Sequence, residues 1–345
     1  MSESYRAAGV DLEAADRAKD RLKELVASTR DANTLSELGA FGGLYAVPDD
    51  VEAPVLVSSA DGVGTKLKVA FMTGRHDTVG QDLVNHCVND ILVQGARPIF
   101  FLDYLATGAM DESVVTDVVT GVALACRENG CALLGGETAQ MPDFYEDDEY
   151  DLAGFIVGVT PRAGIVDGSR IEAGDALIGL RSSGLHTNGY TLARRIVFET
   201  MGLGVDDPFP GLDRTAGEVL LDVHRSYLNQ TMPLIEAGQL RGLVHNTGGG
   251  LPGNLPRILP DGLGAVVERS SWEPGTLFDV LQREGGVGRD EMYRVFNMGA
   301  GMILVVGPDE VDGVMEHLRD AGESPWLIGE IEAVDGDDPR VRYAD

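Results

Sequence analysis

The stretch VGQDLVNHCVNDILVQGARPIFFLDYLA, residues 79–106, combines a predicted helix with a predicted strand. Its first part, Val79–Gln94, repeats apolar residues three and four positions apart, which predicts an amphipathic helix. Its second part, Pro98–Ala106, is a short apolar run that predicts a strand. Further strands are predicted at 54–60, 131–136, 152–160, 176–180, 243–245, 264–268, 302–306 and 326–330. Further helices are predicted at 11–29, 112–128, 190–201, 217–237, 254–258, 276–283 and 308–321.

Strands and helices alternate in both halves of the chain, which predicts two domains of the α/β or α+β class. A length of 345 residues is typical of two domains. Pro161, Gly164 and Gly168 interrupt the pattern and predict a boundary near 162–170. We therefore expect one domain over 1–165 and a second over 166–345.

The net charge of the chain limits the classes of partner that it can bind. There are 27 Lys and Arg against 56 Asp and Glu, a net charge of −29. This surplus argues against a nucleic-acid partner and against an anionic membrane surface, because both require a basic face. An acidic, Lys-poor composition is expected either in a salty cytoplasm or from a GC-rich genome, and the sequence favours neither.

The three cysteines, Cys87, Cys126 and Cys131, form no CxxC pair and are expected to be reduced thiols. The polar N-terminus does not resemble a signal peptide, and no apolar run approaches the roughly 18 residues of a membrane helix. These features predict a cytoplasmic protein.

The motif DGVGTK, residues 61–66, follows a predicted strand directly. It is not a P-loop, because its lysine follows the threonine. Gly62 and Gly64 allow close approach of a ligand to the backbone, Asp61 suits a divalent cation and Lys66 suits a phosphate. The alternative is a tight turn with solvated side chains.

Like Asp61, two other acidic residues lie at positions where they could reach a bound ligand. His86 and Asp90 are neighbours on one side of the helix predicted at 79–94, and Glu137 follows the strand predicted at 131–136. If Asp61, Asp90 and Glu137 converge, they suit Mg²⁺ that carries nucleotide phosphates. The alternative is a solvated helix face. The acidic run Asp143–Asp151 is interpreted as a solvated loop.

Two segments of the second half have the composition of binding loops. SSGLHTNG, residues 182–189, combines hydroxyls with His186 and Asn188 before a predicted helix. HNTGGG, residues 245–250, contains three consecutive glycines whose amides suit a phosphate nest. The alternative for both is ordinary loop chemistry, with His186 as a hydrogen-bonded loop histidine and Asn188 as an N-cap.

Taken in order, nine motifs resemble those of the phosphoribosylformylglycinamidine cyclo-ligase (aminoimidazole ribonucleotide synthetase) family. They are YRAAGVD (5–11), GAFGG (39–43), DGVGTK (61–66), VNDILVQG (88–95), PIFFLDYLATG (98–108), GGETAQMP (135–142), SSGLHTNGY (182–190), TGGGLPGNLPR (247–257) and MYRVFNMGAGM (292–302). The resemblance covers nearly the whole chain. The sequence departs from the pattern at Leu185 and at Leu251–Gly253, which puts the shape of the substrate loops in doubt.

The resemblance implies an enzyme of purine synthesis that converts ATP and formylglycinamidine ribonucleotide into aminoimidazole ribonucleotide, ADP and phosphate. It also implies two α/β domains, Mg²⁺, and a homodimer in which the N-terminal sheets of two subunits pair into a barrel-like structure near the ATP site. The superfamily includes selenophosphate synthetase, thiamine-monophosphate kinase and a hydrogenase maturation protein. The alternatives are another small-molecule phosphotransferase of this superfamily, or a non-catalytic nucleotide-binding scaffold.

The same resemblance implies roles for matching residues. The implied metal ligands are Asp61, Asp90 and Glu137, and the implied catalytic residues are Asp61, Lys66 and His186. The nucleotide is expected to contact Lys23, Gly42, Gly43, Gly62, Gly64, Thr65, Lys66 and Asn89, and the loop containing Gly39 is expected to close over the triphosphate. The substrate is expected to contact Ser183, His186, Thr187, Asn188, Thr247, Gly248, Gly249 and Gly250. His186 is also the candidate for proton transfer, because an imidazole titrates near neutral pH.

Overall fold

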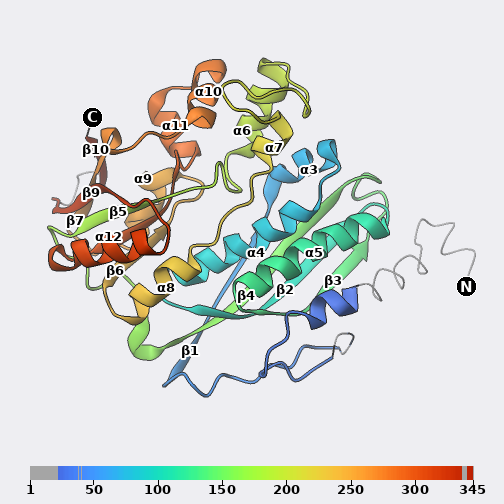
Figure 1. Cartoon of the computed structure of the whole chain (residues 1–345), viewed down its shortest axis with the longest axis horizontal. Helices are drawn as coiled ribbons and strands as arrows, with labels where there is room; N and C mark the ends of the chain where they lie inside the picture. Colours follow the sequence, from blue (N-terminus) through green and yellow to red (C-terminus); the bar gives the residue numbers. More distant parts are fainter. Residues whose placement is uncertain (1–21, 38, 40, 336–339, 345) are drawn as a thin grey trace, which may run out of the picture. The chain divides into compact units, whose positions relative to one another are not determined.

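A computed structural model describes residues 22–37, 39, 41–335 and 340–344 (Figure 1). Contacts divide the chain into two compact units. Unit 1 includes the described residues up to Ile91 together with Arg97–Pro161, and unit 2 includes Leu92–Ala96 and the described residues from Arg162 onward. Each unit has a sheet of its own and is described separately.

Unit 1 contains a four-stranded sheet in the order β1-β4-β2-β3. Its strands are β1 (Pro54–Gly62), β2 (Arg97–Thr107), β3 (Ala132–Gln140) and β4 (Tyr150–Pro161). β4 pairs antiparallel with β1 and with β2, whereas β2 and β3 are parallel. Two parallel strands need a crossover connection, and helix α5 (Glu112–Glu128) supplies it. Asp111 caps this helix by accepting hydrogen bonds from the amides of Ser113 and Val114.

Helices α4 (Asp77–Leu92) and α5 lie side by side on one face of this sheet (Figure 1). Glycine makes their close packing possible: a Cβ on Gly80 would lie 2.1 Å from the carbonyl of Val118, and one on Gly121 would lie 2.0 Å from that of Asp77. Gly154 similarly admits Leu83 of α4 onto β4. The turn η1 (Gly64–Lys66) and helix α3 (Leu67–Thr73) connect β1 to this layer.

The opposite face of the sheet carries exposed apolar side chains. Leu56 on β1 is 57% exposed and Phe155 on β4 is 46% exposed. The register pairs Phe155 with Ala60, so these residues lie on adjacent strands. Part of this unit is covered by its own N-terminal segment, where the ring of Tyr45 lies 5.4 Å from that of Phe100.

Unit 2 contains a six-stranded sheet in the order β10-β7-β9-β5-β8-β6. The neighbouring strands β5 and β8 are buried along nearly their whole length, so both faces of the sheet are covered there. The strands are β5 (Ala176–Arg181), β6 (Leu240–His245), β7 (Leu263–Glu268), β8 (Ala300–Val306), β9 (Trp326–Ala333) and β10 (Val341–Ala344).

The helices of unit 2 are mostly short. They are α6 (Tyr190–Arg194), α7 (Ala216–Leu220), α8 (Leu228–Glu236), α9 (Gly250–Asn254), α10 (Thr276–Gly285), α11 (Arg289–Val295) and α12 (Val311–Asp320). A π-helical segment, η3 (Arg195–Thr200), continues α6. Turns of 3₁₀ helix are η2 (Arg162–Gly164), η4 (Leu255–Arg257), η5 (Arg269–Ser271) and η6 (Pro308–Glu310).

The predicted mixed α/β fold is confirmed, and one helix prediction is wrong. The stretch 217–237 is not one helix: it divides into α7 and α8, and residues 222–227 between them are not helical. The second helix begins at Leu228 with Tyr227 as its N-cap, and the hydroxyl of Ser226, just before the cap, accepts a hydrogen bond from the amide of Leu228. The predicted helix over 11–29 is described only from residue 22, and residues 22–27 are helical. The motif at 5–11 lies outside the described residues.

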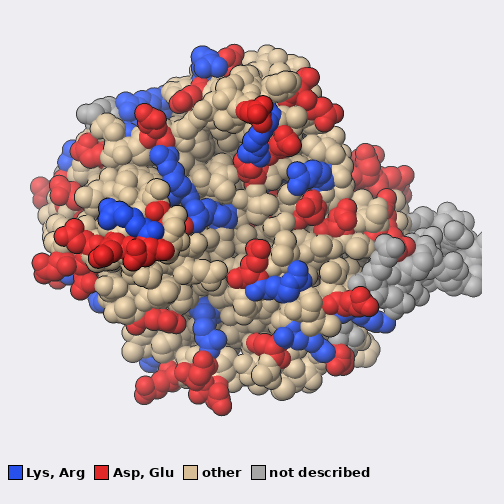
Figure 2. Space-filling view, in the orientation of Figure 1, with Lys and Arg blue, Asp and Glu red and all other residues tan. Residues whose placement is uncertain are grey.

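The surface charges and the cysteines were also the subject of predictions from the sequence. On the face drawn in Figure 2, basic side chains lie in small groups among acidic and uncharged ones. All three cysteines are buried and free. Within the part of the chain that the structure describes, no helix is both long and apolar enough to cross a membrane.

We expect the substitution Gly121→Ala to destabilise the protein. Alanine favours a helix by about 1 kcal/mol over glycine, but overpacking against the backbone of α4 costs about 1–3 kcal/mol. Gly313 on α12 is the matched control, because a Cβ there meets nothing closer than 4.0 Å. Denaturant unfolding should show a lower free energy of unfolding for Gly121→Ala and an equal or higher one for Gly313→Ala. Equal stability of both variants would contradict the close packing.

Candidate functional site

The end of β1 brings an aspartate against a buried histidine. The Oδ2 atom of Asp61 lies 2.9 Å from Nε2 of His86 on α4, and Asp61 is 44% exposed at its side chain. Asp90 lies one helical turn further along α4, with its Oδ2 4.0 Å from the same nitrogen. The hydroxyl of Ser59 donates a hydrogen bond to Asp90. Two partly exposed carboxylates therefore flank one imidazole in unit 1.

The pKa of His86 is raised. Burial alone lowers the pKa of a histidine, because it disfavours the charged form. Here the hydrogen bond to Asp61 and the charges of Asp90, Asp61 and Asp82 outweigh burial. The folded protein therefore carries a protonated, positively charged His86 in mildly acidic solution.

Lys66 does not face solvent. Its side chain is fully buried, and Nζ lies 2.8 Å from Oδ2 and 2.9 Å from Oδ1 of Asp82. The ammonium group of Lys66 is held by Asp82 in this structure, and its contact with nucleotide phosphates stays a prediction. Asn89 is also fully buried, whereas Gly64 and Thr65 are exposed. The exposed part of the DGVGTK motif is thus Asp61, Gly64 and Thr65.

The predicted convergence of three acids is not found within one chain. In the sheet register, Asp61 pairs with Gly154, Gly154 with Asp103, and Asp103 with Gly136. Glu137, next to Gly136, therefore lies on the opposite edge strand, three strand spacings or about 14 Å from Asp61. Among the described residues, no close group of possible metal ligands includes Glu137. Asp61 and Asp90 share a site around His86, and Glu137 does not join them.

The remaining nucleotide candidates lie near the start of unit 1. Lys23 is exposed on the helical residues 22–27. Gly39 has a left-handed φ of 101°, and neither Gly39 nor Gly42 has an atom within 4 Å of the position of a Cβ. Gly43 lies against the side chain of Leu134 on β3. A role for this loop in nucleotide binding stays a prediction.

In unit 2, the loop 182–189 is fastened to the turn before β8. The carboxamide of Asn297 donates a hydrogen bond to the carbonyl of Gly184 at 2.9 Å and accepts one from the hydroxyl of Ser182 at 3.0 Å. The amide of Ser182 also donates to the carbonyl of Gly299. The motif at 292–302 therefore positions the loop that carries His186.

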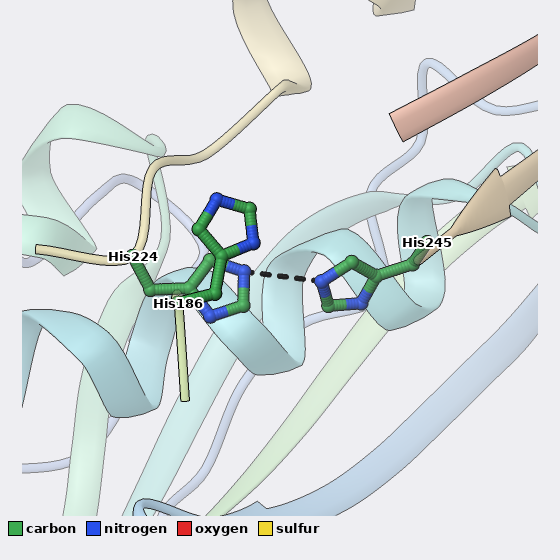
Figure 3. Close-up of side chains that lie close together, drawn as sticks. All are labelled: His186, His224 and His245. Carbon is green, nitrogen blue, oxygen red and sulfur yellow. Dashed lines mark hydrogen bonds between the residues drawn. The ribbon is translucent and has the colours of Figure 1, made fainter. Parts of the chain in front are cut away.

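Three buried imidazoles lie together beside this loop: those of His186, His224 and His245 (Figure 3). The rings of His186 and His224 are stacked, with centroids 3.9 Å apart and an interplanar angle of 11°. The Nε2 atoms of His224 and His245 are 3.0 Å apart. The backbone of His186 has a left-handed φ of 62°, which is uncommon for a residue other than glycine.

The tautomer of His186 follows from its neighbour. The amide of Ser183 donates to Nε2 of His186 at 3.3 Å, so this nitrogen is an acceptor. A neutral His186 then carries its proton on Nδ1. Proton exchange with a ligand would therefore use Nδ1.

Sequence analysis did not identify His224 as a site residue. The helix predicted over 217–237 includes His224, but this residue lies in the non-helical segment between α7 and α8. Ser226, whose hydroxyl accepts a hydrogen bond from the amide of Leu228 at the start of α8, is the local sign of that break. His245 begins the motif HNTGGG, from which no separate role was predicted for this residue.

The glycine turn 247–250 lies against the end of the His186 loop. A Cβ on Gly248 would lie 3.2 Å from Oδ1 of Asn188. Gly250 is required by geometry, because its φ is 61° and a Cβ would lie 1.9 Å from the carbonyl of Tyr293. Asn254 fastens the turn by donating to the carbonyls of Thr247, Gly248 and Gly250. Asn188 is not an N-cap, since Gly189 occupies that position of α6.

Comparison with known proteins identifies the family. Residues 17–160 match the model of the AIR synthase related protein N-terminal domain, and residues 172–342 match that of the C-terminal domain. The chain is 51% identical over 332 residues to the phosphoribosylformylglycinamidine cyclo-ligase of Trichlorobacter lovleyi, covering 96% of this chain and 95% of that one. It is 53% identical to the cyclo-ligase of Sorangium cellulosum, covering 98% of both chains. The chain belongs to the phosphoribosylformylglycinamidine cyclo-ligase family.

The predicted family, enzyme class and function are thereby confirmed. Solved structures show how widely the fold of this cyclo-ligase family is shared. A thiamine-monophosphate kinase from Stenotrophomonas maltophilia has a TM-score of 0.70 at 18% identity, covering 95% of this chain and 94% of that one. A hydrogenase maturation protein HypE in complex with ATP has a TM-score of 0.65, also at 18% identity, covering 94% and 91%.

We expect Asp61→Asn to lower the pKa of His86. The variant removes the carboxylate that raises this pKa, while burial, which lowers it, remains. A raised histidine pKa stabilises the fold most below the unfolded value of about 6.5, and this contribution disappears as pH rises through the folded pKa. The variant should therefore lose stability mainly in acidic solution. An NMR titration of His86 checks this, with Asp50→Asn, which alters an exposed ion pair with Arg97, as control. An unchanged pKa of His86 in Asp61→Asn would contradict this assignment.

Proposed function

We propose that the chain catalyses the ATP-dependent ring closure of formylglycinamidine ribonucleotide to aminoimidazole ribonucleotide, ADP and phosphate. The observation that carries the proposal is identity of 51% and 53%, over almost the entire length, to proteins named for this activity. The aligned residues extend over both units and include both candidate loops of unit 2.

The chemistry proceeds in two steps. A formamide oxygen is a poor leaving group, so transfer of the γ-phosphoryl group from ATP to that oxygen activates the carbon and releases ADP. The amidine nitrogen of the same molecule then forms a bond to this carbon, and the carbon–oxygen bond breaks to release phosphate. Because the second step is intramolecular, correct positioning supplies much of its rate. The first step mainly requires cations and orientation.

Unit 1 supplies the ATP site in this proposal. Asp61 and Asp90 would hold Mg²⁺, since both carboxylates are partly exposed and hard oxygen ligands suit this ion. When bound, Mg²⁺ neutralises charge on the phosphates. The exposed backbone at Gly64 and Thr65 can approach a phosphate closely. In this proposal Lys66 acts as a positioning residue. Its ion pair with Asp82 holds Asp82 of α4 in place beside the site.

Unit 2 supplies the ribonucleotide site. The loop that carries Ser183, His186 and Thr187 adjoins the glycine turn through Asn188 and Gly248. We place the substrate phosphate at the turn 247–250 and the reacting formamide near His186. We assign the proton transfer to Nδ1 of His186, because Nε2 accepts a hydrogen bond from the amide of Ser183.

Turnover is the direct test. Purified protein with Mg²⁺, ATP and formylglycinamidine ribonucleotide should release one ADP per aminoimidazole ribonucleotide, with little ADP when the ribonucleotide is omitted. Asp61→Asn should lower kcat by at least about 100-fold, since it removes a metal ligand, and Asp50→Asn should not. ADP without imidazole would favour a phosphotransferase of the kind that shares the fold. Neither product, at low and at molar salt, would favour a non-catalytic scaffold.

We also propose a homodimer formed through the uncovered face of the four-stranded sheet. Leu56 and Phe155 leave apolar surface exposed there, and a second copy would bury it. This arrangement corresponds to the barrel-like pairing that the family resemblance implies. We further place the enzyme in the cytoplasm, which agrees with three free, buried cysteines.

Substitution of Phe155 by Glu should convert the dimer into monomers, because it places a charge in the centre of an apolar contact. Light scattering coupled to size exclusion measures the mass directly. Leu327→Glu is the matched control, since Leu327 is a similarly exposed apolar residue on β9 of the other unit. A dimer that survives Phe155→Glu would exclude this face as the interface.

A further inference from the structure

His224 lies in a segment that is fastened to the loop carrying His186. The hydroxyl of Ser183 donates to the carbonyl of Val223, just before His224. On the other side, the hydroxyl of Tyr227 donates to the carbonyl of Arg181 at 2.8 Å. His224 itself is fully buried. The break between α7 and α8 thus places this imidazole against the loop by specific contacts.

The ring of His224 contacts three functional groups at once. One face stacks on the ring of His186 at 3.9 Å. Nδ1 lies 3.3 Å from the hydroxyl oxygen of Thr187. Nε2 lies 3.0 Å from Nε2 of His245 (Figure 3). His186 and Thr187 are proposed substrate contacts, and His245 immediately precedes the glycine turn. His224 therefore connects the two substrate loops.

The two hydrogen bonds of His224 depend on each other. A single proton fits between two Nε2 atoms at 3.0 Å, so one imidazole donates and the other accepts. If a neutral His224 donates through Nε2, its Nδ1 must accept from the hydroxyl of Thr187. If it accepts through Nε2, its Nδ1 donates to Thr187. The direction of the Thr187 hydroxyl is thereby linked to the tautomer of His245.

The same geometry does not favour a metal ion bound by all three rings. A ring nitrogen binds a metal in the plane of the imidazole, and two rings stacked at an angle of 11° direct their lone pairs along parallel planes. In addition, Nε2 of His186 accepts from the backbone of Ser183. Hydrogen bonding and stacking account for the cluster.

We propose that His224 is a positioning residue of the ring-closing site. It holds the plane of the His186 imidazole by stacking, and it orients the Thr187 hydroxyl through the hydrogen bond that it shares with His245. The proposal rests on the proposed function, which places His186 and Thr187 at the ribonucleotide.

Two substitutions separate the two contributions. His224→Phe keeps a flat ring that can stack on His186 but removes both hydrogen bonds. His224→Gln keeps polar groups but removes the stacking ring. Each should lower kcat about tenfold or more, while KM for ATP stays within about twofold of wild type. His317→Gln is the control, because His317 lies on α12 outside the cluster and contacts the carbonyl of Gln230.

A double-mutant cycle with His186→Ala tests whether His224 acts through His186. In the His186→Ala background, His224→Gln should lower kcat by no more than about twofold, because the stacked ring is already absent. A full additional tenfold loss would overturn the action of His224 through the His186 ring, and a fall in activity that only follows a lower melting temperature would overturn the positioning role as a whole.

The remaining outcomes distinguish this inference from the proposed function. A lower but measurable turnover in His186→Ala together with full turnover in both His224 variants overturns the role of His224 alone. Full turnover in His186→Ala overturns the role of His186 as well. One equivalent of Zn²⁺ that wild type retains after dialysis and His224→Phe does not would overturn the hydrogen-bonded arrangement in favour of a metal site.

Discussion

The close approach of α4 to the first sheet sets the geometry of unit 1. Gly154 and Gly158 on β4 leave room for Leu83 and Ile91, and Gly80 allows α5 to pack against the same helix. With α4 held at this distance, His86 meets Asp61 at the end of β1, and Asp82 meets Lys66. The polar residues of the helix are thus positioned by the apolar contacts of its other side. A bulkier residue at any of these glycines would shift the helix and, with it, both ion pairs.

Much of the fold follows from local patterns. The helix at 112–128 is observed with the same bounds, because its N-cap aspartate and apolar stripe are both encoded within the segment. Strand ends differed from the predictions by only a few residues. The stretch 217–237 was predicted wrongly because its apolar spacing continues through residues that tertiary contacts hold out of a helix, including the bond from Tyr227 to Arg181. Periodicity does not reveal contacts between segments distant in sequence.

The candidate site was also predictable only in part, because contacts between distant segments determine which residues meet. Asp61 and Asp90 were predicted together, and the structure places both beside His86. Glu137 was grouped with them because it also follows a strand, but strand order decides which ends are neighbours, and β3 lies at the far edge from β1. The burial of Lys66 was equally unpredictable, because its partner Asp82 lies sixteen residues away on another element. The family resemblance supplied roles that residue spacing could not.

The exposed apolar face of the first sheet has a consequence for how the chain associates. A second copy that covers this face also has a net charge of −29. Contact between apolar surfaces then competes with long-range repulsion, which physiological salt screens over about 8 Å. Association through this face should therefore strengthen as ionic strength rises, and in dilute buffer the acidic surface favours separate chains.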